Sequence, residues 1–328
     1  MKSFLKVTQI SLAFLWIAAP SLTYAIEGRC WSWDSWPCAT SYDFSCPPTC
    51  WTGKEFVCLD LLYWHASQGG LSSTCDHTKT VNQTDIRGKL ISRLEGRGED
   101  PNFDWDWGYR LGGGFDFACW DFALFWTHFN AKSSGSHKAV NHNNWHLDLN
   151  YADLIAGYKM DLAECFQLRP YIGLRGARIT QHSKSQFVNT VEQEHLINTA
   201  TIIGRDREHF TGVGPLLGLE GNWTIGCGYS FFVAGDAGVM YGNSKVRVTN
   251  VEVFDTTTNF SHLKDFQRNP QFFVDAALGL SWTYCFCSNT QLTLFLGLEH
   301  HTFFNQNHFC NYGDLNLDGG TFSASLEF

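Results

Sequence analysis

The chain has 328 residues and a formal net charge of −9, with aromatic residues at 16% and charged residues at only 17%. This acidic balance argues against a nucleic-acid-binding protein, because nucleic acids attract basic surfaces. Abundant aromatic residues and 30 glycines are typical of pleated strands and of the aromatic girdles of membrane barrels.

The first 25 residues are predicted to be a secretory signal peptide. Two early lysines precede an apolar run over Leu12–Ala19, and Thr23 and Ala25 are the small residues of a cleavage site. The apolar run is too short for a membrane anchor. We therefore expect residues 1–25 to be removed and the mature chain to leave the cytoplasm.

Residues 26–55 form a separate segment rich in cysteine and proline, which should lack strands because proline cannot donate to a ladder. Twelve cysteines in an oxidising compartment favour disulfides. The spacing of cysteine and histidine fits no zinc site, so we expect no metal and no cofactor. Bonding within the chain and cross-linking between chains both remain open. The candidate disulfide cysteines are Cys30, Cys38, Cys46, Cys50, Cys58, Cys285 and Cys287.

Two-residue alternation dominates the chain after residue 55. The odd positions from Tyr229 to Tyr241 are apolar, and so are the even positions from Phe272 to Tyr284. Such runs predict strands with one apolar face. Their length reaches the roughly 9–11 residues of a tilted membrane strand, beyond the roughly 5–6 of an average soluble one.

These strands predict an all-β fold, a transmembrane antiparallel β-barrel over residues 56–328. Because bacterial single-chain barrels have even strand numbers, we expect about 12 strands, with two either way. Two weaker candidates begin near Ile86 and Gln186. The clearer strands begin near Phe56, Trp107, Trp120, Trp145, Phe166, Phe210, Gly228, Ser244, Gln271, Gln291 and Thr321.

The connections between these strands are expected to alternate in length. Tight turns are predicted at Cys287–Asn289 and Gly242–Lys245, and long polar loops at Lys132–Asn144 and Asn305–Asp318. Short turns at one rim and long loops at the other are the layout of outer-membrane barrels.

The candidate functional residues are charges on the polar faces of these strands, since a charge facing lipid at mid-depth costs about 2–4 kcal/mol. Arg175 and Arg178 have opposite parity, so only one of them can line the lumen, and alternation leaves both open. No catalytic residue is predicted, because the sequence lacks a nucleophile elbow and a zinc-protease motif. The other candidates for the pore lining are Arg110, Asp116, Asp236, Lys245, Arg247, Asp275 and Glu299.

Four segments resemble landmarks of the Legionella-type pore-forming major outer membrane proteins, a family with relatives among the environmental chlamydiae. They are "DLLYWHASQGGL" (Asp60–Leu71), Phe103–Phe129, His146–Ile179 and "GVGPLLGLEGNW" (Gly212–Trp223). The resemblance implies a porin-like barrel in the outer membrane and names no solute. The cysteine-rich leader departs from the Legionella pattern and is similar to the disulfide-linked envelope proteins of chlamydiae.

The leading hypothesis is a porin that passes small hydrophilic solutes by passive diffusion through a water-filled lumen. The first alternative is a disulfide-cross-linked structural barrel with little or no open pore. The second is a secreted β-sandwich that binds carbohydrate through exposed tryptophans. Outer-membrane lipid is the expected environment, and homo-oligomers or disulfide-linked envelope proteins are expected partners.

The final stretch, "TFSASLEF", is an alternating strand with its apolar face ending at Phe328. This ending resembles the signal by which the barrel-assembly machinery recognises outer-membrane proteins, which makes that machinery an expected partner. Deleting Phe328 should lower the amount of assembled, heat-modifiable barrel and increase periplasmic degradation, as measured on gels of whole envelopes. A normal amount of heat-modifiable barrel in the deletion variant would contradict this role.

Overall fold

The computed structural model describes residues 54–69, 103–137, 141–163, 165–193, 196–254, 257–286, 290–308 and 313–328. The predicted signal peptide, the cysteine-rich segment before Lys54 and the weak strand near Ile86 lie outside the described residues. Within the described ranges, no helix has the length and apolarity to cross a membrane.

The regular structure of the described residues is antiparallel β-sheet. The strands pair in the order β4-β3-β2-β1-β11-β10-β9-β8-β7-β6-β5. Their bounds are β1 (Glu55–Gln68), β2 (Trp105–Phe117), β3 (Trp120–His137), β4 (Asn141–Tyr158), β5 (Met160–Ala163), β6 (Phe166–Gln193), β7 (Leu196–Gly226), β8 (Tyr229–Phe254), β9 (Thr257–Cys285), β10 (Gln291–Asn307) and β11 (Gly313–Glu327).

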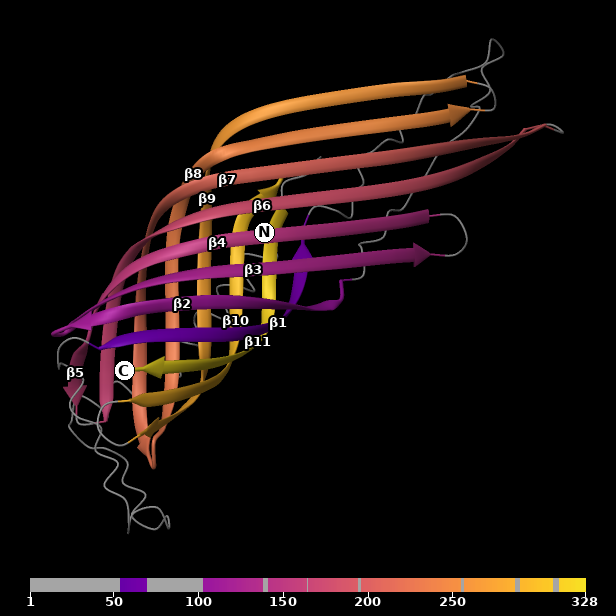
Figure 1. Ribbon diagram of the computed structural model, residues 1–328. Coiled ribbons are helices and arrows are strands. Elements are labelled where there is room, and N and C mark those ends of the chain that lie inside the picture. The colour runs from indigo at the N-terminus through magenta and orange to yellow at the C-terminus, as the bar shows by residue number, and fades with distance from the viewer. Residues whose placement is uncertain are drawn as a thin grey trace.

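A further pairing between β4 and β6, from His142↔Gln186 to Gly157↔Tyr171, closes the sheet into a barrel. Ten strands form the wall, and the four-residue β5 is an addition beside β6. Figure 1 shows the strands curving around a common interior, with β10 and β11 behind β2, β3 and β4. A single closed sheet of this kind differs from the two packed sheets of the β-sandwich alternative.

The ten wall strands are at the lower end of the expected range, because two expected boundaries are absent. The segment Gly242–Lys245, expected to be a turn, lies inside β8, where Gly242 pairs with both Gly212 and Asn269. A Cβ at Gly242 would lie 2.6 Å from the Cα of Gly212, so glycine here permits close approach of two strands. The candidate strand near Gln186 likewise continues β6.

Two segments expected to be long loops belong largely to strands. Pairing between β3 and β4 continues up to His137↔Asn141, and β11 begins at Gly313. Outside a membrane, both faces of a paired strand can be polar, so polarity alone does not mark a loop.

The two rims differ. One rim, here called the lower rim, has short connections from Phe117 to Trp120 and from Gly226 to Tyr229. Both described ends of the chain meet there, since Glu55 N–H donates to the Phe328 carbonyl at 3.0 Å and Phe328 N–H donates back at 2.9 Å. The opposite rim is formed in part by longer strands, since β6 to β9 have 26 to 31 residues each.

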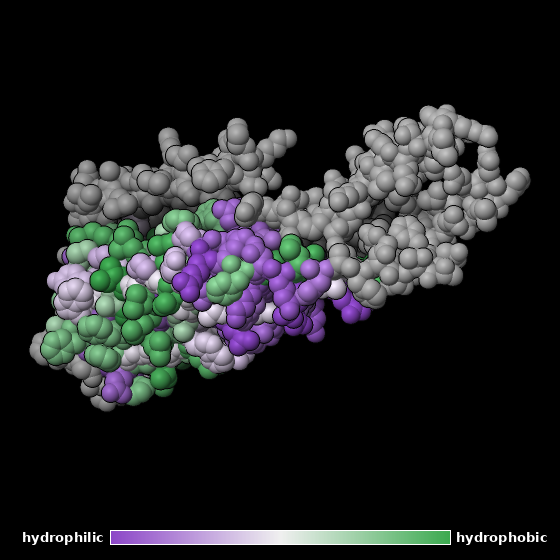
Figure 2. Space-filling model, turned by 90° about the horizontal axis from the view of Figure 1, so that it is seen from above, coloured by the Kyte–Doolittle hydropathy of each residue, from purple (hydrophilic) through white to green (hydrophobic). Residues whose placement is uncertain are grey.

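The outer face of the barrel carries an apolar band. Figure 2 shows hydrophobic residues gathered over one part of the surface and hydrophilic residues over the part beyond it. Aromatic side chains lie at both edges of the band, as expected for the two interfaces of a bilayer. The exposed aromatics of the lower edge include Phe117, Trp120, Tyr229 and Phe328, and those of the upper edge, here called the upper girdle, are Tyr63, Trp105, Trp107, Trp126 and Tyr241.

The band predicts a depth-dependent response to charge. Leu217 is 65% exposed on the outer face of β7, within the band. Replacing Leu217 by Arg should lower the free energy of unfolding in lipid vesicles by about 2–4 kcal/mol, because the charge would meet lipid at mid-depth. The matched variant is Asn243→Arg, at an exposed outer position past Tyr241. This variant should change the free energy of unfolding little. Equal effects at the two positions would contradict the assignment of the band.

Candidate lumenal site

A network of charged side chains lies inside the barrel at the level of the apolar band. Nη1 of Arg175 on β6 is 2.5 Å from Oδ2 of Asp275 on β9. Two strands, β7 and β8, separate β6 from β9 in the wall. The contact therefore crosses the interior.

Arg175 is the centre of the upper half of this network. Its Nε and Nη2 donate to both carboxylate oxygens of Asp153, at 2.6 and 2.7 Å. The guanidinium carbon lies 4.6 Å from the ring centroid of Tyr151 and 4.3 Å from that of Phe273. The side chain is only 3% exposed, so the charge is stabilised by paired carboxylates and aromatic faces rather than by water.

Arg110 is the centre of the lower half. Its two terminal nitrogens donate to both oxygens of Glu299, at 3.1 and 3.0 Å, and Nη1 also donates to Asp60 at 3.1 Å. Nε donates to Thr127 Oγ1 at 3.1 Å. The planar guanidinium thus has a partner on each side, which fixes its orientation.

His301 connects the two halves. Its Nδ1 lies 3.0 Å from Oδ1 of Asp275, and its Nε2 lies 3.1 Å from Oε2 of Glu299. An imidazolium has an N–H on each nitrogen and so suits a position between two carboxylates. The ring also packs on Trp64, with centroids 4.6 Å apart. A continuous chain of charged groups therefore runs from Arg110 to Arg175.

Further ion pairs lie between this network and the lower rim. Arg169 pairs with Asp121 and donates to Glu220 at 2.8 Å, and Lys159 Nζ donates to Asp116 at 2.6 Å. A cavity of about 370 Å³ adjoins these groups, with Asp236, Arg169 and Arg110 among its lining. Asp236 accepts a hydrogen bond from the Tyr171 hydroxyl at 3.1 Å.

An apolar layer fills the interior on the other side of the network. Trp64 on β1 contacts Phe129 on β3 across the intervening β2, with ring centroids 5.3 Å apart. Small barrels have an interior only wide enough for side chains, and the described side chains occupy it here. Fully buried members of the layer include Leu62, Trp64, Phe129, Leu147, Leu149, Phe303, Leu315 and Leu317.

The structure divides the predicted pore-lining residues into two sets. Arg175 rather than Arg178 faces the interior, since Arg178 is exposed on the outer face. Lys245 and Arg247 also lie on the outer face, contrary to the prediction, because β8 continues without a turn and keeps them on the side of Tyr241. The others face the interior: Arg110, Asp116, Asp236, Asp275 and Glu299.

The predicted disulfide cysteines are only partly within the described residues. Cys58 has a free thiol, contrary to the prediction, and lies on the interior side of β1, where its Sγ would be 2.6 Å from a Cβ at Gly112. Cys285 is disulfide-bonded. The others lie outside the described residues: Cys30, Cys38, Cys46, Cys50 and Cys287.

Sequence reasoning missed Asp60, Asp153 and His301. Around Asp60, both faces of "LDLLYW" are apolar, because one face meets lipid and the other the apolar layer. Alternation therefore gave no signal there. His301 carried no motif, and only its position between two carboxylates identifies it. Among the described residues, no group of three or more His, Cys, Asp or Glu is placed to hold a metal ion.

The network predicts different effects of substitution at Arg175 and at Arg178 of β6. Arg175→Met should lower the free energy of unfolding in vesicles by about 3–5 kcal/mol, because it leaves Asp153 and Asp275 as buried, unpaired carboxylates. Arg178→Met should have little effect. Combining Arg175→Met with Asp153→Asn and Asp275→Asn should recover much of the loss. Equal losses for the two single variants would contradict the interior network.

The chain is similar to several solved structures and to one protein family, whereas no curated protein matches it. Among solved structures, the outer membrane protease OmpT from Escherichia coli is 11% identical, with 84% of this chain and 97% of that chain covered and a TM-score of 0.43. Neisserial surface protein A is 12% identical, with 84% and 97% covered and a TM-score of 0.28. The Pseudomonas putida toluene transporter TodX is 7% identical, with 86% and 90% covered and a TM-score of 0.27.

These structural similarities are too low to support any statement about activity. The family match is extensive by contrast, since it spans the cysteine-rich segment's end and nearly all of the barrel. Residues 45–325 match the family described as Legionella pneumophila major outer membrane protein precursor, and the chain therefore belongs to this family of outer membrane proteins.

Proposed function

We propose that the protein is an outer-membrane channel for the passive diffusion of small hydrophilic solutes, and that its described state is closed. The observation that carries this proposal is the interior network around Arg110, His301 and Arg175. Ionisable side chains at membrane depth are expensive and commonly mark an ion or solute pathway. A barrel that only had to stay folded could fill the same space with apolar side chains at no loss of stability.

The balance of charge favours cations as the permeating ions. Five carboxylates surround two guanidinium groups and one imidazole at this level. An excess of acidic side chains along a lumen attracts cations and repels anions. The five are Asp60, Asp153, Asp236, Asp275 and Glu299.

Opening would require two rearrangements. The Arg175–Asp275 contact spans the interior and would have to part. The Trp64–Phe129 contact of the apolar layer would have to separate as well. Because both are packed, we expect openings to be brief and narrow, unlike those of the wide 16- to 18-stranded porins.

A structural role in the envelope is the second candidate, and the packed apolar layer is the observation that favours it. Cys119, Cys165 and Cys285 are disulfide-bonded, which suits an oxidising compartment. In both candidates the chain would be exported through its predicted signal peptide and inserted by the barrel-assembly machinery. Cross-linking to other envelope proteins through the cysteines of residues 26–55 would belong to this second role.

Conductance in planar bilayers distinguishes the two. The wild-type protein should give rare, small, cation-selective steps. Trp64→Ala should raise the open probability several-fold, because it removes a large side chain from the apolar layer. The matched control is Trp107→Ala, since Trp107 is 67% exposed on the outer face, and it should behave as wild type.

Two results would count against the channel. An absence of steps in both wild type and Trp64→Ala, with heat-modifiable barrel present, would favour the structural role. Anion-selective steps would contradict the argument from the carboxylates.

A further inference from the structure

A row of basic and imidazole side chains crosses six neighbouring strands on the outer wall, above the upper girdle. The strands are β3, β4, β6, β7, β8 and β9, and each member is the direct cross-strand partner of the next. The basic row is Lys132, His146, His182, Arg207, Arg247 and Lys264.

The row faces outward and lies beyond the apolar band. Lys132 has the parity of Trp126 on β3, and Arg247 has the parity of Tyr241 on β8, so both point to the side of the girdle aromatics. The six residues from Tyr241 to Arg247 span roughly 20 Å of strand, or roughly 15 Å of height at a typical tilt. The row therefore lies beyond the hydrocarbon, on the part of the outer wall past the upper girdle.

Within the described part of the chain, the lysines and arginines of the row have no acidic partner at ion-pair distance. Among the described residues, no ion pair includes Lys132, Arg207, Arg247 or Lys264. Arg207 instead donates through Nε to Nδ1 of His182, at 2.9 Å. Burial, with Arg207 and His146 nearby, lowers the pKa of His182. Like charges placed opposite one another destabilise a sheet, so an anion bound along the row would relieve repulsion.

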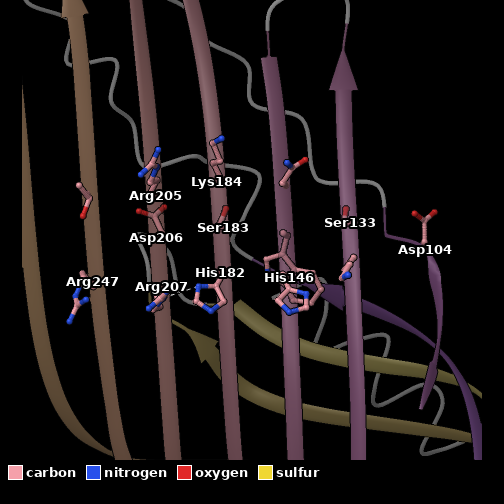
Figure 3. Close-up of a pocket in the computed structure, with 14 residues that line it drawn as sticks. Asp104, Ser133, His146, His182, Ser183, Lys184, Arg205, Asp206, Arg207 and Arg247 are labelled. Atoms are coloured by element: carbon pink, nitrogen blue, oxygen red, sulfur yellow. Dashed lines mark hydrogen bonds between the residues drawn. The ribbon is translucent and has the colours of Figure 1, made fainter. Parts of the chain in front are cut away.

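The wall is hollowed where the row crosses it. A hollow of about 750 Å³ has five of the six row members in its lining, all but Lys264. Lys184 and Arg205, from the next outward positions of β6 and β7, add two more cations. Asp104 and Asp206 are the acids of the lining. Figure 3 shows Arg247, Arg207, His182 and His146 side by side on neighbouring strands, with Lys184 and Arg205 above them.

We propose that the basic row and its hollow bind the phosphate groups of phosphorylated lipids in the leaflet around the barrel. Three features favour a lipid over a soluble anion. The hollow lies on the outer wall, the apolar band of the same wall can hold acyl chains, and the cations spread over six strands suit several phosphates. Arginine binds phosphate with two parallel hydrogen bonds, and lysine adds attraction near an anionic surface. The inference does not depend on channel activity.

Binding of a defined lipid tests the proposal. The full mature chain, in neutral detergent micelles, would be titrated with bisphosphorylated lipid A, with the same lipid after removal of both phosphates, and with inorganic phosphate. The wild type should bind the phosphorylated lipid, more weakly as salt rises, and should bind the other two far less. Combining Arg207→Gln, Arg247→Gln and Lys264→Gln should weaken binding by roughly 100-fold.

Two controls keep the test decisive. Arg207→Lys with Arg247→Lys keeps the charge and should retain most of the binding. Heat-modifiable migration of every variant verifies the barrel, since the substituted side chains are exposed. Equal binding of the two lipid forms, unchanged binding by the glutamine variant, or inorganic phosphate binding as tightly as the lipid would each overturn the proposal.

Discussion

Pairing between β4 and β6 is the interaction on which the rest of the structure depends. In a bilayer every backbone N–H and C=O needs a partner within the protein, so a sheet can cross only if it has no free edge. Once the sheet is closed, alternate residues of each strand are forced to face lipid or the interior. The chemistry of every side chain in the wall then follows from its parity and its height.

Inside the barrel, parity brings together charges from strands that are not neighbours. Arg175 and Asp275 meet across the interior, and His301 connects that pair to Arg110 and Glu299. A buried ion pair gains little over an apolar filling, whereas a broken one costs several kcal/mol. While its ion pairs are intact, the network therefore keeps the interior side chains in one arrangement. The same charges would supply a polar path if the arrangement opened.

Outside the barrel, the outward side chains of a single strand meet hydrocarbon along one part of the strand and water or headgroups along the next. On β8 the outward side chains are apolar up to Tyr241 and then include Lys245 and Arg247, with no break in the strand. An outward charge is costly beside hydrocarbon and stable beside water or headgroups. The change from apolar to basic side chains along the outer face of β8 therefore marks the height at which the hydrocarbon ends. The basic row lies past that boundary, on the same outer wall as the apolar band.

The sequence by itself determined the all-β fold, the apolar faces of the clearest strands and the resemblance to the family. Each of these depends on residues that are close together in the chain: the alternation from Tyr229 to Tyr241, the apolar face that ends at Phe328, and the family-like motifs. Only the tertiary structure decided that Arg175 rather than Arg178 faces inward, that Lys245 and Arg247 face outward, and that Asp60, Asp153 and His301 join one network. The reason is that parity is a local property, whereas strand continuity, register and closure depend on pairing between residues far apart in the chain.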